Sequence, residues 1–290
     1  MTPSEFFSPD AETRIEPGDF VGHFLAQRGL NLASVGLRPT VVLPLIPVLE
    51  RRLLRALGDP SAQPPPIQRQ ALYQPADVPF ALITSPMGAP MAVMLLEQLI
   101  ALGARRVLYL GFCGALIPPY RIGDLLLPTY GVREEGTSYH YVPADVVPYA
   151  SPQIQALLQA QALRQRCAIS QGPIWTTDAP YRETPHKIRQ FQDMGIHAVD
   201  MEMAALFAVA QYRGCELGAL LIVSDECYHP TWKPGFGAPR LRQACDDAVS
   251  LAIATARVLG ACSALSTPPA AATPSAPPFG KRDDAGSADV

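Results

Sequence analysis

Short, mostly apolar segments alternate with longer segments of helical periodicity along most of this chain, and this alternation limits the fold more than any other sequence feature. Such apolar segments, several of them rich in β-branched residues, are typical of strands buried on both faces of a sheet, as in parallel sheets covered by helices. The predicted strands are Thr40–Leu45, Phe80–Thr84, Arg106–Gly111, Asp124–Pro128, Ile169–Trp175 and Leu217–Ser224. The sequence therefore predicts a single α/β domain with a central mixed, mostly parallel sheet flanked by helices.

The intervening segments and the two ends define the domain boundaries. We expect a flexible N-terminus over 1–17, one folded domain over 18–262 and a disordered tail over 263–290, which is rich in Pro, Ala and Ser. The proline cluster at 59–66 predicts a surface loop inside the domain. Apolar residues at helical spacing predict helices at 48–57, Met91–Leu102, Pro152–Arg164, Pro185–Met194, Met201–Tyr212 and Ala238–Leu259.

Composition argues against several classes of protein. The net charge is −3 and 48% of the residues are hydrophobic, so neither a nucleic-acid partner nor disorder of the whole chain is expected. The most apolar windows, Ala89–Gly103 and Ala248–Ala264, fall short of the ~20 apolar residues of a membrane-spanning helix. The acidic N-terminus lacks the features of a signal peptide, and the six cysteines form no C-x-x-C pair. We therefore expect a cytoplasmic protein with no membrane partner.

Two loops of small residues follow predicted strands. SPMGAP at 85–90 lies between a strand and a helix, where a ligand can approach the backbone and the helix N-terminus supplies donors. LGFCGAL at 110–116 follows the central strand. Ligands of open α/β sheets bind at the carboxyl ends of strands, which is where both loops lie. Each loop is equally compatible with an ordinary turn, and no G-x-G-x-x-G motif of a dinucleotide site occurs.

Two acidic motifs follow in the second half of the chain. VDMEMAAL at 199–206 places Asp200 and Glu202 at the start of an apolar helix, where carboxylates either complement the helix dipole or bind the vicinal hydroxyls of a sugar. IVSDE places Asp225 just after a buried strand. A carboxyl group there either caps a turn or, with its pKa raised by apolar surroundings, serves as a general acid.

Taken in order, these motifs resemble the nucleoside phosphorylase family, which includes purine nucleoside phosphorylase, uridine phosphorylase and the adenosylhomocysteine-type nucleosidases. The resemblance runs from about Thr40 to Leu259. Its most specific stretches are SPMGAP, LEQLIALGARRVLYLGFCGAL, IGDLLLPTYGVREEGTSYHY, WTTDAPY, VDMEMAAL and IVSDE. It implies a catalytic domain that cleaves the N-glycosidic bond of a nucleoside, with no metal or organic cofactor and with phosphate as a possible co-substrate.

The resemblance also implies roles for particular residues. Cleavage builds positive charge on the sugar and negative charge on the leaving base, so a carboxylate at the sugar and a proton donor at the base both help. Asp225 matches the acid that purine-cleaving members use at N7 of the base, which favours purine substrates. Glu202 would hold the ribose 2′ and 3′ hydroxyls. The walls of the sugar and base site would be formed by Met201, Val199, Cys113 and Gly114.

Family members form dimers to hexamers in which a histidine of a neighbouring subunit closes the 5′ end of the ribose. His23 lies at about the matching distance before the first strand, although a lone histidine is equally compatible with a structural role. The resemblance therefore implies a homo-oligomer, with His23 as a ligand that crosses the subunit boundary.

The phosphate-binding residues of the family are not conserved in this chain. Phosphorolytic members carry Gly-Asp-Pro and then an arginine near the first strand, where this chain reads Pro-Leu-Ile-Pro-Val and Leu49. A second arginine and a hydroxyl residue are replaced by Tyr109 and Phe112. Other cations nearby, out of register, are Arg51, Arg52 and Arg69. Phosphate and water thus both stay open as the nucleophile, and the alternatives are a uridine-type phosphorylase or a non-catalytic nucleoside or base sensor.

Overall fold

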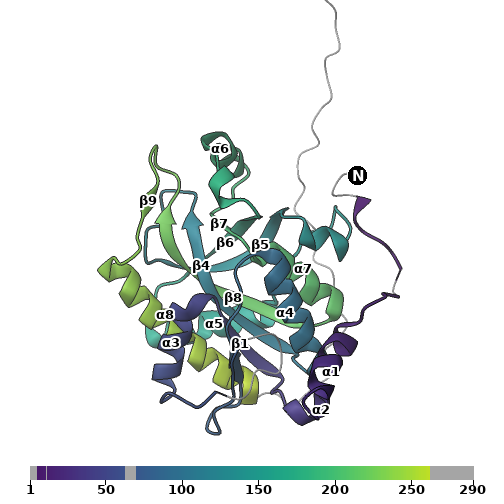
Figure 1. Ribbon diagram of the computed structural model, residues 1–290. Coiled ribbons are helices and arrows are strands. Elements are labelled where there is room, and N and C mark those ends of the chain that lie inside the picture. The colour runs from purple at the N-terminus through teal and green to yellow at the C-terminus, as the bar shows by residue number, and fades with distance from the viewer. Residues whose placement is uncertain (1–4, 11, 63–69, 262–290) are drawn as a thin grey trace, which may run out of the picture.

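The computed structural model describes residues 5–10, 12–62 and 70–261, and its centre is one mixed nine-stranded sheet. The strands are β1 (Thr40–Pro44), β2 (Leu72–Tyr73), β3 (Ala81–Ile83), β4 (Arg106–Ala115), β5 (Leu125–Glu134), β6 (Ser170–Thr177), β7 (Ala198–Asp200), β8 (Glu216–Glu226) and β9 (Lys233–Pro234). Their order is β2-β3-β1-β4-β7-β6-β5-β8-β9, and β4 pairs with β8 as well. That additional pairing closes β4, β7, β6, β5 and β8 into a ring, from which β1, β3 and β2 extend (Figure 1).

Helices cover both faces of the sheet (Figure 1). On one face, α4 contacts both α1 and α7; on the other, α8 contacts α3 and α5. The helices are α1 (Pro17–Ala26), α2 (Leu32–Val35), α3 (Ile46–Ala56), α4 (Ala89–Ala101), α5 (Pro152–Gln165), α6 (Pro185–Asp193), α7 (Met203–Arg213) and α8 (Pro239–Ala261). The chain also contains the 3-10 turns η2 (Thr137–His140), which contacts α7 and α4, and η3 (Pro180–Arg182).

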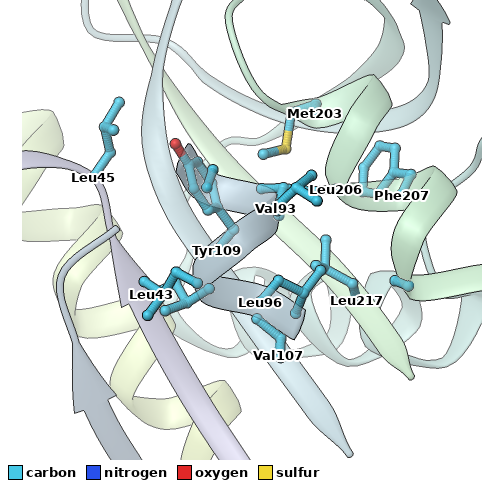
Figure 2. Packing of buried hydrophobic residues seen from close by; sticks show 14 of the residues in the cluster. Leu43, Leu45, Val93, Leu96, Val107, Tyr109, Met203, Leu206, Phe207 and Leu217 are labelled. Atoms are coloured by element: carbon cyan, nitrogen blue, oxygen red, sulfur yellow. The ribbon is translucent and has the colours of Figure 1, made fainter. Parts of the chain in front are cut away.

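Successive residues of the central strands point into two different hydrophobic clusters. In β4, Val107 and Tyr109 belong to the cluster under α4 and α7, whereas Leu108 and Leu110 belong to the cluster under α8. Figure 2 shows strand side chains of the first cluster packed against side chains of α4 and α7. Because both faces are covered, every strand position prefers an apolar residue, which explains the continuous apolar runs in the sequence.

The predicted fold class is confirmed, with differences at particular elements. The three-residue strand β7 and the two-residue strands β2 and β9 are not predicted, because such short pairs leave no period in a sequence. Helix α7 begins at Met203 rather than Met201, because Asp200 accepts hydrogen bonds from the backbone amides of Glu202 and Met203 and holds a turn there. Helix α1 begins at Pro17, the last residue of the segment expected to be flexible.

Two other expectations fall mainly outside the described residues. The tail at 263–290 lies there entirely, and the proline cluster at 59–66 lies there in part. Among the helices of the described ranges, none combines the length and the hydropathy needed to cross a membrane.

Candidate functional site

Strand register brings three of the predicted site residues together. Gly114 of β4 is paired with Val199 of β7 on one side and with Asp225 of β8 on the other. A Cβ atom added at Gly114 would lie 2.8 Å from Sγ of Cys227 and 3.2 Å from both Oδ2 of Asp225 and Cγ1 of Val199. Glycine is therefore required here, because any side chain would push against the residues that surround the carboxyl group.

A β-bulge directs the side chain of Asp225. The register of β4 and β8 changes from Cys113 opposite Val223 to Gly114 opposite Asp225, so Ser224 is the extra residue on β8. The hydroxyl of Ser224 lies 3.2 Å from the Cys113 carbonyl oxygen and 2.6 Å from Oδ1 of Asp225. Bulges often re-aim a side chain beside a functional site, and this one lies at the carboxyl end of two parallel strands.

The carboxyl group of Asp225 is half-buried and makes three polar contacts. Besides the Ser224 hydroxyl, the indole Nε1–H of Trp232 donates to Oδ2 over 2.8 Å, and the thiol of Cys227 donates to the same oxygen over 3.2 Å. Ser224 is in β8, Cys227 directly follows it, and Trp232 directly precedes β9. They leave the carboxyl group with one fixed orientation beside Gly114.

The two acids of the VDMEMAAL motif have different surroundings. Asp200 is bound within the turn: its Oδ2 accepts from the amides of Glu202 (3.0 Å) and Met203 (2.7 Å), and its Oδ1 accepts from the hydroxyl of Thr176 (2.6 Å). Thr176 in turn accepts from the amide of Ala204 over 2.9 Å. The helix-start role that the sequence left open for both acids is therefore performed by Asp200.

Glu202 points instead toward the SPMGAP loop. Its Oε1 accepts from the backbone amide of Gly88 over 2.7 Å, although the two residues are 114 positions apart in the chain. Gly88 has φ +92°, a conformation that L side chains rarely adopt. The residue is buried, with 2% of its surface exposed. Burial raises the pKa of Glu202, the charge of Asp200 raises it further, and the hydrogen bond from Gly88 opposes both.

Cys113 lies between the two acidic motifs. Burial raises the pKa of its thiol well above the usual value, and the carboxylates of Asp200 and Asp225 add to the shift. Because both carboxylates affect the pKa of Cys113, which is 3% exposed, the thiol lies close enough to each of them for a charge interaction. Met201 is half-buried in the turn between Asp200 and α7. The predicted wall residues thus share one region of the structure with both acids.

Tyr109 fills the space on the other side of Glu202. Its side chain is fully buried, and a Cβ atom at Gly111 would lie 2.5 Å from its ring. The pKa of Tyr109 is raised by burial first and then by the carboxylates of Glu202 and Asp200. In Figure 2 its hydroxyl points away from Val107. An aromatic ring therefore occupies the position where the family resemblance places a phosphate arginine.

The remaining residues of the predicted phosphate region face elsewhere. Leu49 is fully buried in the cluster on the α8 side of the sheet, and Arg52 forms an ion pair with Asp246 of α8. Phe112 is half-buried between the two hydrophobic clusters, and Arg51 is exposed on α3. Arg69 lies outside the described residues. Arg52 is thus directed away from Glu202 by its own salt bridge.

Sequence reasoning missed one acid of this region, Glu183, which follows η3. Burial raises its pKa to about 7, and the negative charge of Asp225 contributes next, followed by opposing effects from Cys227 and Lys187. The motif WTTDAPY ends two residues before Glu183, so nothing in its local pattern marks it as a site residue. Its interaction with the charge of Asp225 joins two segments far apart in the chain, so no local pattern could have indicated it.

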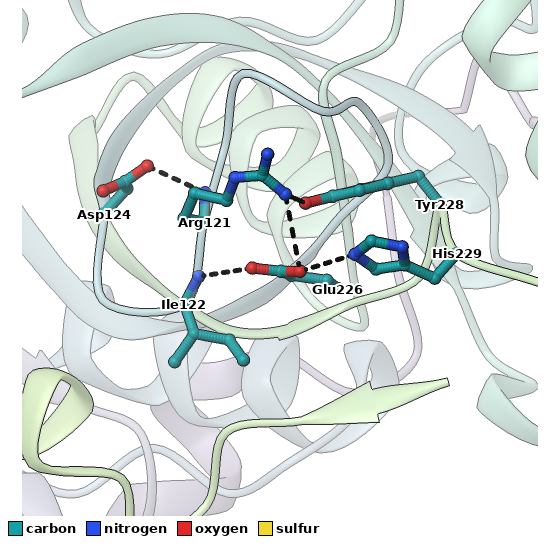
Figure 3. A network of polar contacts seen from close by, with 6 residues as sticks. All are labelled: Arg121, Ile122, Asp124, Glu226, Tyr228 and His229. Atoms are coloured by element: carbon teal, nitrogen blue, oxygen red, sulfur yellow. Dashed lines mark hydrogen bonds and ion pairs between the residues drawn. The ribbon is translucent and has the colours of Figure 1, made fainter. Parts of the chain in front are cut away.

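Glu226, next to Asp225 in sequence, belongs to a separate polar network (Figure 3). Its carboxylate accepts from the backbone amide of Ile122 (3.3 Å), contacts the imidazole of His229 (2.8 Å) and lies 3.8 Å from the guanidinium of Arg121. Arg121 also donates to the hydroxyl of Tyr228. The network joins the loop before β5 to the segment after β8, and so it supports the strand end that carries Asp225.

His23 lies apart from these groups. It is exposed on α1, where its ring contacts Phe24, and its Nε2 is 3.1 Å from Nε2 of the Gln27 side chain. Within one chain its side chain is therefore exposed to solvent.

Comparisons with known proteins establish the family of this chain. The family profile described as "Phosphorylase superfamily" matches residues 62–254. A guanosine phosphorylase of Halorubrum lacusprofundi is 31% identical over 185 residues, which are 63% of this chain and 75% of that protein. A uridine phosphorylase of Haemophilus influenzae is 25% identical over 195 residues, 62% of this chain and 76% of that protein.

Among solved structures, a purine nucleoside phosphorylase from Toxoplasma gondii in complex with immucillin-H matches with a TM-score of 0.72 at 19% identity. The match covers 80% of this chain and 94% of that one. At this identity the likeness supports the fold, while the profile match over two thirds of the chain establishes the family. Together with the site at the strand ends, these matches identify the chain as a member of the phosphorylase superfamily, the family of the nucleoside phosphorylases and nucleosidases.

Proposed function

We propose that this protein cleaves the N-glycosidic bond of purine nucleosides, with Asp225 as general acid, Glu202 as the anchor of the ribose hydroxyls and water as nucleophile. The observation that carries the proposal is the convergence of the two carboxyl groups at one end of the sheet. Gly114 links Asp225 to Val199 across the strands, and Val199 directly precedes the turn that carries Glu202.

Asp225 is the proposed proton donor to the leaving base. As the C1′–N bond breaks, its electron pair moves to the base, and a proton donated by Asp225 to N7 neutralises the developing charge. The Trp232 indole, the Ser224 hydroxyl and the Cys227 thiol then hold the resulting carboxylate. The preference for purines rests on this acid, because a purine offers N7 as a proton acceptor and a pyrimidine does not.

Glu202 is the proposed ligand of the sugar hydroxyls. Its Oε1 is held by the Gly88 amide, which fixes the carboxylate, and its remaining acceptor sites are available to two vicinal hydroxyls. A carboxylate at that place orients the ribose and stabilises the positive charge that develops at C1′. Ribose as the sugar, and not a deoxyribose, follows from the same contact, since a missing 2′ hydroxyl would leave the buried carboxylate with one bond fewer.

Water as nucleophile is supported by the side chains beside Glu202. Phosphate dianions are normally held by charge-assisted bonds, each worth ~1.5–3 kcal/mol, and a buried dianion without them is costly. Here the charge of Glu202 raises the pKa of Tyr109, which is fully buried, and Arg52 is engaged by Asp246. The region where the resemblance places phosphate therefore suits an uncharged nucleophile better than a dianion.

The proposal is tested by incubating the purified protein with purine and pyrimidine ribonucleosides, with and without phosphate, and identifying the sugar product. We expect free ribose and a purine base at a rate that added phosphate does not increase. Saturable dependence on micromolar to millimolar phosphate, with ribose 1-phosphate as product, would refute water as nucleophile. Binding of nucleosides without any turnover would instead favour a nucleoside sensor.

We also propose that the protein works as a homo-oligomer in which α1 and α4 of one subunit contact a second copy. Large apolar side chains are exposed along these two helices and the loop before α4: Phe20 (40%), Phe24 (46%), Met87 (56%), Met91 (43%) and Met94 (37%). Contiguous exposed apolar residues are typical of interaction surfaces. Met87 adjoins Gly88, so such an interface would lie beside Glu202 and could bring in His23 of the second copy.

Light scattering at micromolar concentration is expected to give the mass of a dimer or a larger assembly. Phe24→Glu is expected to shift the protein toward the monomer, because a charge in an apolar interface is desolvated without a partner. Val21→Ala, on the buried side of the same helix, serves as the control that changes packing without adding charge. A wild-type monomer at that concentration would refute both the assembly and the role of His23.

A further inference from the structure

The chain segment that follows β8, residues 227–238, folds back over the end of that strand. Its strand β9 pairs antiparallel with the last two residues of β8. Beyond β9, the amide of Gly235 donates to the carbonyl oxygen of Ser224 over 2.9 Å. A Cβ atom at Gly235 would lie 2.3 Å from Cγ2 of Ile122 and 2.7 Å from that carbonyl oxygen, so only glycine fits. The segment is thus fixed against the strand end that carries Asp225.

Before β9, the same segment is held by the polar network of Glu226 (Figure 3). The hydroxyl of Tyr228 accepts from Arg121, and the imidazole of His229 contacts Glu226. Trp232 therefore lies between two anchored stretches, the first at Tyr228 and His229 and the second at β9. Its place at the end of β8 is set by the backbone on both sides of it.

The indole of Trp232 is fixed at one atom, while most of the residue is exposed. Its Nε1–H donates to Oδ2 of Asp225 over 2.8 Å, yet the residue is 60% exposed. Trp175, the other of the two tryptophans, is fully buried. Phe236, whose ring centroid is 6.2 Å from that of Trp232, is 68% exposed. Large aromatic rings gain most from burial, so an exposed pair beside a polar anchor is typical of a surface that receives a ligand.

The contacts of Asp225 leave one acceptor position for a ligand. A carboxylate has about four such positions, two on each oxygen. Oδ2 receives two hydrogen bonds, from Trp232 and Cys227, whereas Oδ1 receives one, from Ser224. Within the part of the chain that the structure describes, these three are the donors to the carboxyl group. The fourth position, on Oδ1, is therefore the one at which a base can meet Asp225.

We propose that Trp232 binds the purine base of the substrate, with its indole packed against the base while its Nε1–H holds Oδ2 of Asp225. The inference rests on the proposed function of Asp225 at N7. A base nitrogen bonded to Oδ1 and an indole nitrogen 2.8 Å from Oδ2 belong to two flat ring systems held by one carboxyl group. Their edges lie near enough for the rings to pack, and aromatic pairs prefer offset or edge-to-face arrangements with centroids ~4.5–7 Å apart. Trp232 thus adds to the purine preference, because a bicyclic purine covers more of the indole than a pyrimidine does.

Two substitutions separate packing on the base from positioning of Asp225. Trp232→Gln keeps an N–H donor for Oδ2 but has no ring, so KM for purine ribonucleosides is expected to rise by roughly 5- to 150-fold, the range for loss of one base–aromatic stack, with a smaller change in kcat. Trp232→Phe keeps a ring without the donor, so KM should stay within a few-fold while kcat falls. Tyr212→Leu removes an exposed aromatic side chain near the last residue of α7 and, as the control, should change neither.

Base binding can also be measured without turnover, from tryptophan emission. Because Trp175 is fully buried, acrylamide quenches mainly the exposed indole of Trp232. We expect adenine or hypoxanthine to lower the emission of the wild-type protein and to protect it from acrylamide, and uracil to do so less. Both changes should be absent in Trp232→Phe, although equilibrium dialysis should show that this variant still binds the purine base.

Adenine and hypoxanthine that bind by equilibrium dialysis without changing the wild-type emission would overturn the proposal, as would an unchanged KM in Trp232→Gln or failure of both bases to bind. A protein that shows the protected emission but cleaves no nucleoside would contradict the proposed function and leave the base site standing. Cleavage of purine nucleosides with unchanged emission would do the reverse. If far-UV circular dichroism shows that Trp232→Gln does not fold, the wild-type emission still decides.

Discussion

Asp225→Asn is expected to lower kcat by ~10²–10⁴-fold, the range for loss of general acid–base catalysis, with a much smaller change in KM. Asparagine has nearly the same shape: its one acceptor oxygen can take the hydrogen bond from the Trp232 indole, and its NH2 group can donate to the Ser224 hydroxyl, so the local structure should persist. It has no acidic proton for N7 of the base. The measurement is steady-state release of purine base, compared at equal concentrations of folded enzyme.

The neighbouring residue offers a matched control. Glu226 is adjacent in sequence but belongs to the network with Arg121 and His229, so Glu226→Gln removes a buried carboxylate without touching the reacting atoms (Figure 3). That variant should lose stability but keep kcat within a few-fold. If Asp225→Asn turned over at a near-normal rate, Asp225 would have no part in the mechanism; if both variants lost activity equally, the loss would reflect the strand end and not the acid.

Glu202→Gln is expected to lower kcat/KM by roughly 10²-fold, because exchanging two charge-assisted hydrogen bonds to the ribose hydroxyls for neutral ones costs about 1–2 kcal/mol each. The glutamine oxygen can still accept from the Gly88 amide, so the SPMGAP loop should keep its position. Both kcat and KM should worsen, since the contact exists in the bound substrate and strengthens as charge develops at C1′.

The pH dependence gives this prediction a second test. Burial and the charge of Asp200 raise the pKa of Glu202, so raising the pH increases the carboxylate form and should increase sugar binding in the wild type. Glu202→Gln should remove that rise. Glu97→Gln, which alters a buried carboxylate of α4 that pairs with Arg213, controls for the loss of a buried charge elsewhere. An unchanged KM for ribonucleosides in Glu202→Gln would exclude it as the ribose anchor.

Much of the fold was accessible from local pattern. Strands buried on both faces need apolar residues at every position, so β1, β4 and β8 stand out as continuous runs, and the helices between them show the 3.6-residue period. Motifs at the carboxyl ends of those strands must meet at one edge of a parallel sheet. For that reason SPMGAP, FCGAL and IVSDE could be expected at one edge of the sheet before any contact was known, whereas VDMEMAAL was assigned to the same site by the family resemblance.

The other features of the fold and the site depend mainly on contacts between segments that are far apart in the sequence. The sequence determined the α/β class and the residue types at the strand ends, because burial and periodicity act within a few neighbouring positions. Only the tertiary structure showed that the strands close into a ring through the β4–β8 pair, that Asp200 holds the turn while Glu202 reaches Gly88, and that Tyr109 lies against Glu202. Except for the Asp200 turn, which is local, these arrangements depend on register and side-chain packing between segments far apart in the chain, and no local pattern records them.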